Sequence, residues 1–233
     1  MGVSAPRHPR SSDEELLEAE TSAILAELTD AQRLLRIQDE LRNGFQALGR
    51  IGKAVSIFGS ARTPRDDPRY ERARQLARRL GEEGFAIITG GGPGIMEAAN
   101  KGAAEADGVS VGLGIELPFE QGLNDYVNLG INFRYFFARK TMFVKYAQGF
   151  IVMPGGFGTF DELFEALTLV QTRKVTSFPV VLFGSDYWQG LLDWLSSSVL
   201  SYGCIYERDL GLLQVTDDVE EAVAIMQTSR DPA

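Results

Sequence analysis

Two periods of apolar positions alternate along most of the chain, and they predict strands followed by helices. Short, continuous apolar runs are typical of strands buried on both faces of a sheet. They occupy 53–58, 85–89, 109–113, 150–153, 179–183 and 213–215. Apolar residues three or four positions apart predict helices over 68–83, 93–106, 136–146, 159–172, 187–198 and 218–227, with an irregular segment before about residue 131. This alternation indicates a Rossmann-like, doubly wound α/β fold, with a parallel sheet covered by helices on both faces.

A further helix is predicted ahead of the alternating region, as an N-terminal helical extension over 30–48. Its apolar stripe comprises Leu34, Ile37, Leu41, Phe45 and Leu48. Residues 1–12 are rich in Pro, Ser and Arg, and 13–28 are acidic, so we expect 1–28 to be largely disordered or frayed. We expect 29–233 to form a single domain, on which the stripe packs unless it packs on a partner subunit.

The composition of the chain argues against nucleic acid, membranes and metal ions as binding partners. The formal charge of −9 disfavours nucleic acid and anionic membranes, and the arginines of 69–79 interleave with Glu71 as on a solvated helix face. No apolar stretch approaches the roughly 20 residues that span a bilayer. The single cysteine, Cys204, fits a reducing, cytoplasmic location. The only histidine, His8, lies in the N-terminal tail, and no cluster with metal-ligand spacing occurs, so we expect no metal.

Glycines follow nearly every predicted strand. The glycines at these strand ends include Gly59, Gly90, Gly114, Gly155 and Gly184. One such glycine would indicate only a tight turn. In an open parallel sheet, however, ligands bind outside the carboxyl ends of the strands. The repeated glycines therefore predict a shared crevice in which backbone approaches a ligand.

The most informative of these turns is PGGFGTFDE at 154–162. Its glycines let the backbone approach a ligand closely, and the N–H groups of the helix that follows favour an anion. Glu162 lies one turn inside that helix, so a carboxylate would stand beside a bound phosphate. The same residues also fit a capping box, in which Thr159 caps the helix and Glu162 bonds back to it. Spacing alone does not decide between the two interpretations.

The glycine loop at 90–97, GGGPGIME, does not match the dinucleotide-binding fingerprint. Ile95 stands where G-x-G-x-x-G requires its third glycine. A Gly-Lys-Ser/Thr sequence, which a P-loop needs, is also missing from the chain. Neither NAD binding nor ATP hydrolysis is indicated, whereas a mononucleotide phosphate remains compatible with the loop.

Three motifs occur in order and carry a family resemblance: GGGPGIME at 90–97, RKTM at 139–142 and PGGFGTFDE at 154–162. Together they resemble the LOG ("lonely guy") family, long mislabelled as lysine decarboxylases, over about 53–227. The resemblance implies a cytokinin riboside 5′-monophosphate phosphoribohydrolase, in which water cleaves the N-glycosidic bond to give a free base and ribose 5-phosphate. The N-terminal extension resembles the longer bacterial branch of the family.

The resemblance also implies roles for individual residues. Arg139 and Glu162 would be the catalytic pair, with Glu162 stabilising the positive charge that develops on the ribose. Arg139 would bridge phosphate and carboxylate and keep Glu162 ionised. The residues implied to bind phosphate or line the nucleotide are Gly59, Ser60, Gly91, Gly92, Met96, Lys140, Pro154, Gly155, Gly156, Gly158 and Thr159. No metal or other cofactor is needed for this chemistry.

Alternatives remain open at this level. A non-catalytic nucleotide or cofactor binder could use the same fold, and molybdenum-cofactor carrier proteins resemble this domain. The pair Arg139 and Glu162 favours an enzyme, but the sequence does not separate plain AMP from prenylated AMP as substrate. The stripe of 30–48 and the aromatic segment 133–137 predict at least a homodimer, with its interface near the active site. The family resemblance allows a hexamer of three dimers.

Overall fold

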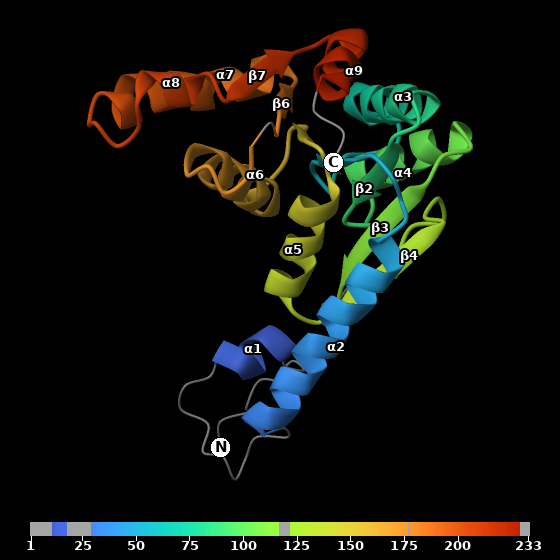
Figure 1. The fold of residues 1–233 in the computed structure, drawn as a ribbon. Helices are drawn as coiled ribbons and strands as arrows, with labels where there is room; N and C mark the ends of the chain where they lie inside the picture. Colours follow the sequence, from blue (N-terminus) through green and yellow to red (C-terminus); the bar gives the residue numbers. More distant parts are fainter. Residues whose placement is uncertain (1–10, 18–28, 117–121, 177, 229–233) are drawn as a thin grey trace, which may run out of the picture.

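A parallel sheet forms the centre of the protein, with helices on both of its faces (Figure 1). The computed structural model describes residues 11–17, 29–116, 122–176 and 178–228. The strands are β1 (Ala54–Phe58), β2 (Ala86–Thr89), β3 (Ser110–Ile115), β4 (Leu129–Phe133), β5 (Phe150–Val152), β6 (Val180–Phe183) and β7 (Leu213–Thr216). The helices are α1 (Ser12–Leu17), α2 (Asp30–Leu48), α3 (Pro68–Glu82), α4 (Ile95–Glu105), α5 (Phe136–Tyr146), α6 (Phe157–Gln171), α7 (Ser185–Trp194), the π-helix η1 (Leu195–Leu200), α8 (Glu207–Leu210) and α9 (Val219–Gln227). The predicted Rossmann-like class is confirmed.

The strand order determines where a ligand can bind. All neighbouring strands pair in parallel, in the order β4-β3-β2-β1-β5-β6-β7. The chain first moves outward from β1 to β4, and α5 then returns it to place β5 on the other side of β1. The order therefore reverses between β1 and β5. Open parallel sheets bind ligands at such a switch point, outside the carboxyl ends of the strands.

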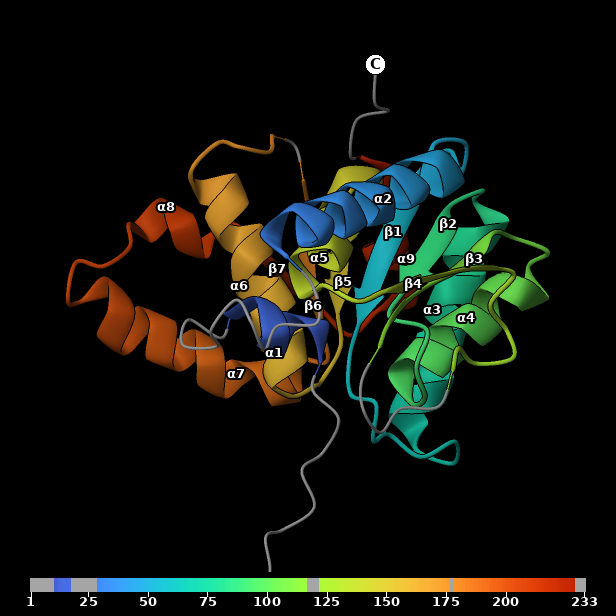
Figure 2. The same cartoon turned by 90° about the horizontal axis from the view of Figure 1, so that it is seen from below.

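The two faces of the sheet carry separate hydrophobic layers. Val55 and Ile57 of β1 pack into the layer formed with α3, α4 and α9. Ala54 and Phe58 belong to the opposite layer, which α2, α5 and α6 cover and to which Trp188 of α7 contributes. This division follows the two-residue period of a strand. Figure 1 and Figure 2 show α3 and α4 on one side of the molecule and α5 and α6 on the other.

The predicted leading helix is present with the expected bounds, as α2. Thr29 and Gln32 form a capping box at its start, and Leu48 is buried at its end. The buried carboxylate of Glu40 accepts from the backbone N–H of Arg134 at 3.1 Å, which fastens α2 to the start of α5. Ile37, Leu41 and Leu48 pack on the domain, whereas Leu34 and Phe45 remain 66% and 41% exposed, so only part of the stripe is covered. Residues 1–10 and 18–28 lie outside the described residues, and Ser12–Leu17 forms α1.

The structure adds elements that the apolar pattern did not predict. β4 occupies part of the segment expected to be irregular, at the edge of the sheet beside β3. Gly130 and Asn132 of this strand are exposed and break the apolar run, which explains the missed strand. The helix expected over 187–198 begins earlier, at Ser185, and continues into η1. Within the described ranges, no helix is long and apolar enough to cross a membrane.

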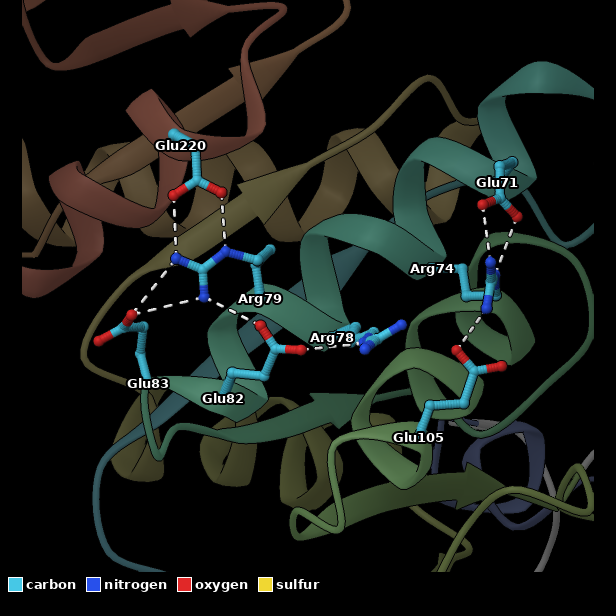
Figure 3. A network of polar contacts seen from close by, with 8 residues as sticks. All are labelled: Glu71, Arg74, Arg78, Arg79, Glu82, Glu83, Glu105 and Glu220. Atoms are coloured by element: carbon cyan, nitrogen blue, oxygen red, sulfur yellow. Dashed lines mark hydrogen bonds and ion pairs between the residues drawn. The ribbon is translucent and has the colours of Figure 1, made fainter.

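The arginines of α3 form the surface ion-pair network drawn in Figure 3. Arg74 pairs with Glu71 on its own helix at 2.8 Å and also with Glu105 of α4. Arg79 pairs with Glu220 of α9 at 2.7 Å. The network therefore ties together the three helices of one face. Most of these side chains are partly exposed, which agrees with the expectation of a solvated helix face.

Candidate active site

A cavity of about 740 Å³ opens at the switch point of the sheet. The loops after β1 and β5 meet there, where the Ser60 N–H donates to the Pro154 carbonyl at 3.0 Å. The sequence-predicted residues that line it are Gly59, Ser60, Gly92, Met96, Arg139, Pro154, Gly155, Gly156, Gly158, Thr159 and Glu162. Segments from four parts of the sequence thus converge on one space. Gly91 and Lys140, which were also predicted, are not among the residues that line it.

The turn after β5 presents the start of α6 to this cavity. Gly156 is the N-cap residue, and no side chain of the described residues forms a capping hydrogen bond there. A Cβ at Gly155 would lie 2.1 Å from the Oγ1 of Thr159, so only glycine allows this tight approach. The first N–H groups of a helix lack partners within the helix. The turn therefore offers uncapped N–H groups to an anion in the cavity.

The capping-box interpretation of Thr159 and Glu162 is wrong. The helix begins at Phe157, so Thr159 lies inside its first turn and is not the N-cap. Glu162 lies in the second turn and is 8% exposed. Its Oε2 atom has no hydrogen-bond partner within the described part of the chain. A buried carboxylate oxygen without a partner is costly to stability, and such costs are typical of functional sites.

The pKa of Glu162 is raised to about 7, chiefly because burial disfavours the charged form. The positive charge of Lys140 opposes this increase, and the negative charges of Glu165 and Asp161 add to it. Arg139 opposes it more weakly than Lys140 does. We expected Arg139 to keep Glu162 ionised. The structure differs, because burial outweighs the charges of both cations.

Arg139 is held by backbone carbonyl groups at the ends of two strands. Its Nε donates to the Leu113 carbonyl at 2.8 Å and its Nη2 to the Gly90 carbonyl at 3.4 Å. Its guanidinium also lies 5.3 Å from the ring centroid of Phe143. These contacts hold a cationic group in the lining of the cavity, and the planar guanidinium suits two carbonyl acceptors at once.

The two predicted residues outside the lining have structural neighbours instead. Lys140 of α5 forms ion pairs with Asp161 at 3.0 Å and Glu165 at 3.2 Å, both from α6. Gly91 accepts at its carbonyl from the Asn124 backbone N–H at 2.8 Å. The motif thus identified the right region of the chain, but adjacent residues of one motif face different directions.

The glycine loop after β2 is packed against the loop after β1. Ile95 donates its N–H to the Ser60 carbonyl at 3.0 Å. Gly94 has a φ of 69°, and a Cβ there would lie 2.4 Å from the same carbonyl oxygen. Glycine is required at this position for both reasons. The loop holds Ser60 in place from the side opposite Pro154.

Sequence reasoning missed several residues that line the cavity: Arg62, Arg69, Phe136, Phe143 and Tyr187. The Tyr187 hydroxyl donates to the Gly155 carbonyl at 2.6 Å and so supports the glycine turn from α7. Nothing in the sequence placed Tyr187 at the cavity, because α6 and β6 separate α7 from the glycine turn along the chain. Arg62 could have been found, since it comes two residues after Ser60.

Arg62 and Arg69 differ in their partners. Arg69 is paired with Asp67 at 2.6 Å. No ion pair or side-chain hydrogen bond engages the Arg62 guanidinium among the residues that the structure describes. Arg62 is therefore a cation of the cavity lining whose charge no carboxylate of the described residues neutralises by an ion pair.

Comparison with known proteins agrees with this geometry. A family model described as "Possible lysine decarboxylase" matches residues 96–226. A cytokinin riboside 5′-monophosphate phosphoribohydrolase of Rhodococcoides fascians is 25% identical over 184 residues, covering 76% of this chain and 90% of that protein. A pyrimidine/purine nucleotide 5′-monophosphate nucleosidase of Escherichia coli (strain K12) is 34% identical over 136 residues, covering 52% of this chain. The match spans only 30% of that longer nucleosidase.

Solved structures share the fold. The protein TM1055 matches with a TM-score of 0.58 at 25% identity, covering 75% of this chain and 98% of that one. The molybdenum cofactor carrier protein MCP of Chlamydomonas reinhardtii matches with a TM-score of 0.57 at 24% identity, covering 76% and 96%. The second likeness bears on the fold alone, because its sequence identity is low.

Proposed function

The chain belongs to the LOG family, and from this premise we propose that it hydrolyses the N-glycosidic bond of a nucleoside 5′-monophosphate. The products are the free base and ribose 5-phosphate. The observation that carries the proposal is Glu162, a buried carboxylate near the start of α6 that lines the cavity and whose Oε2 has no hydrogen-bond partner among the residues that the structure describes. A catalytic carboxylate must keep an oxygen available for the substrate, and Glu162 lines the cavity. Glu165, whose Oε2 also lacks a hydrogen bond within the described residues, lies outside that lining and faces Lys140 instead.

The residues divide the chemistry as follows. The N–H groups at the start of α6, with Thr159, bind the 5′-phosphate and thereby place the ribose over Glu162. Cleavage builds positive charge on the ribose ring, and ionised Glu162 stabilises that charge and orients water for attack at C1′. The oxygen of water bonds to C1′, and the base departs with the electron pair of the broken N-glycosidic bond. A proton from the water is transferred to the departing base nitrogen. Arg139 contacts the nucleotide from the base of the cavity.

The pKa of Glu162 suits this role. A general base works best with a pKa near the operating pH, and burial brings Glu162 to about 7. Because the ionised form acts, activity should fall on the acid side of that value. Two titrations therefore determine the pH at which the rate falls on the acid side: that of Glu162 and that of the substrate phosphate, whose second pKa is about 6.

The substrate is an adenine nucleotide, either plain AMP or a prenylated derivative. The support for this class comes from the names of the relatives and from a cavity whose volume lies in the range of small-molecule sites. Incubation with AMP and isopentenyl-AMP, followed by chromatography, should show free base from at least one of them. Adenosine is the matched control without phosphate, and equal kcat/KM for adenosine and AMP would contradict phosphate binding by the glycine turn.

A second candidate is a carrier that binds a phosphorylated cofactor without turnover. The observation that favours it is the likeness to a solved structure of a Moco carrier protein at 27% sequence identity, with a TM-score of 0.55. A carrier would bind AMP or its cofactor and release no base, and its binding would not require Glu162. The same chromatography therefore separates the two candidates.

We also propose that the enzyme works in the cytoplasm as a homodimer at least, with a hexamer of three dimers as the larger assembly. Phe157 is 95% exposed beside the cavity mouth, and an apolar groove of about 550 Å³ follows α6 past Phe164. A second copy of the chain would cover this surface and complete the rim of the site. Light scattering at micromolar concentration tests the assembly, and a monomer with full activity would contradict it.

A further inference from the structure

Charges of both signs surround the buried carboxylate of Glu162 and come from two neighbouring helices. Asp161 and Glu165 flank it on α6, and Lys140 of α5 pairs with both. The Lys140 side chain is only 17% exposed. The ion pairs lie at 3.0 and 3.2 Å, so one largely buried cation joins the two carboxylates on either side of Glu162.

This arrangement exceeds what is needed to join two helices. α5 and α6 both pack on the hydrophobic layer that contains Phe143 and Leu163, which already holds them on the sheet. Exposed ion pairs contribute little to stability, and burying an ammonium group costs free energy. A partly buried lysine among three carboxylates is therefore better explained by its electrostatic effect on Glu162, the buried one of the three.

We propose that Lys140 is a positioning residue that balances the negative charges of Asp161 and Glu165 and so sets the charge state of Glu162. The inference rests on the proposed function, because it assigns Lys140 to the control of the catalytic carboxylate. Lys140 lies outside the cavity lining and acts through Glu162, not on the substrate.

The direction of each effect follows from the groups that face Glu162. These are Arg139 and Lys140 from α5, and Asp161 and Glu165 from α6. Among the two cations, Lys140 has the larger effect and lowers the pKa of Glu162, while Glu165 and Asp161 raise it. Removing the lysine charge should therefore raise the pKa of Glu162 further, and removing the charge of Glu165 should lower it.

The test compares the pH dependence of kcat/KM for AMP hydrolysis in four variants and the wild type. Lys140→Met should move the acid limb up by about one pH unit, which at pH 6 is about a tenfold loss. Glu165→Gln should move it down, and Lys140→Arg should leave it nearly unchanged. Lys145→Met removes a charge from the same helix outside the cluster and is the matched control. The titration of the substrate phosphate is common to all variants and cancels in the comparison.

A merely structural role predicts a different pattern. Loss of packing would lower kcat/KM at every pH and would move the limb in the same direction, or not at all, in Lys140→Met and Glu165→Gln. Either pattern would overturn the proposal. If Lys140→Met does not fold, Glu165→Gln should still move the limb down while Lys140→Arg leaves it nearly unchanged, and an unmoved limb in Glu165→Gln would overturn the proposal.

A second measurement does not depend on turnover. In protein carrying ¹³C at the glutamate carboxyl carbons, the Glu162 resonance is assigned by its loss in Glu162→Gln, and its titration is followed by NMR. A midpoint that rises in Lys140→Met and falls in Glu165→Gln supports the role of Lys140 even if no nucleotide is hydrolysed. Unmoved midpoints overturn it even if AMP hydrolysis is confirmed.

Discussion

Two clusters of carboxylates and cations in this protein show opposite electrostatic behaviour. In the surface network of Figure 3, hydrogen bonds from Arg74 and Gln75 lower the pKa of Glu71 to about 2. At the switch point of the sheet, burial raises the pKa of Glu162 to about 7, and its Oε2 lacks a partner among the described residues. Both carboxylates lie on helices, Glu71 on the arginine-rich α3 and Glu162 on the largely apolar α6. The difference shows that burial beside a cavity, not helical spacing, sets the carboxylate proposed to be functional apart from a surface one.

The sharpest way to break this comparison is to neutralise one carboxylate in each cluster. Glu162→Gln keeps the shape of the side chain but removes the charge, and we expect base release to fall about 100-fold or more, the scale of losing one preorganised electrostatic group. Glu71→Gln is the matched control and should keep wild-type kcat. Chromatographic rates for both variants check this, and comparable losses would mean that the distinction between the clusters is wrong.

A second comparison concerns arginines. Arg139 uses two of its nitrogens on the carbonyls of Leu113 and Gly90, a planar pattern that a lysine cannot reproduce. We expect Arg139→Lys to lower kcat/KM about 30-fold, within the range for losing charge-assisted hydrogen bonds. Arg74→Lys in the surface network should change kcat/KM less than twofold. A kinetic assay with AMP decides, and full activity in Arg139→Lys would remove the arginine from the catalytic pair.

The third prediction concerns stability, for which the two clusters have opposite signs. Because the folded-state pKa of Glu162 lies above its ordinary value of 4.5, the stability that its protonated form contributes is present below pH 4.5 and is lost as the pH rises through about 7. Glu162→Gln avoids this loss, so its advantage over wild type in unfolding free energy should grow by about 2 kcal/mol between pH 5 and pH 8. Urea denaturation at both pH values measures it.

For Glu71 the reverse holds. Its pKa is lowered, so the stability from its contacts is present at neutral pH and is lost as the pH falls through about 2. Glu71→Gln should therefore show no growing advantage between pH 5 and pH 8. A growing advantage in both variants would indicate a general charge effect and would contradict the assignment to Glu162.

The smallest effect is expected for Arg62, and it tests whether this arginine contributes to phosphate binding. Arg62 lines the cavity without an ion-pair partner in the described ranges, whereas Arg78 pairs with Glu82 on the surface of α3. Arg62→Ala should raise KM for AMP about tenfold and change kcat little, as expected for a lost charge-assisted contact to phosphate. Arg78→Ala is the control. An unchanged KM in Arg62→Ala would leave phosphate binding to the start of α6 alone.

Much of the fold could be predicted because its causes are local. The strands at 53–58 and 150–153 are buried on both faces, so their continuous apolar runs are visible in the sequence. β4 could not be predicted in this way, because an edge strand with Gly130 and Asn132 has no such run. The strand order also lies beyond the pattern, since nothing in the sequence shows that β5 pairs with β1.

The residues of the candidate site also divide into those that the sequence predicted and those that it did not. The glycine turn and Glu162 were found because a motif places them in one short segment. Tyr187 was missed because it reaches the turn from another helix, and Lys140 was placed in the lining because it stands next to Arg139 in the chain. Whether a side chain faces the cavity or the neighbouring helix depends on packing, which the motif does not encode.

The central claim is that this site cleaves the N-glycosidic bond and that Glu162 is required for it. The most direct measurement follows AMP by ³¹P NMR in the presence of wild type and of Glu162→Gln, with adenine quantified in parallel. The account predicts that wild type converts the AMP signal into that of ribose 5-phosphate with an equal amount of adenine, and that Glu162→Gln does not. Release of inorganic phosphate with adenosine, or conversion at equal rates by both proteins, would contradict it.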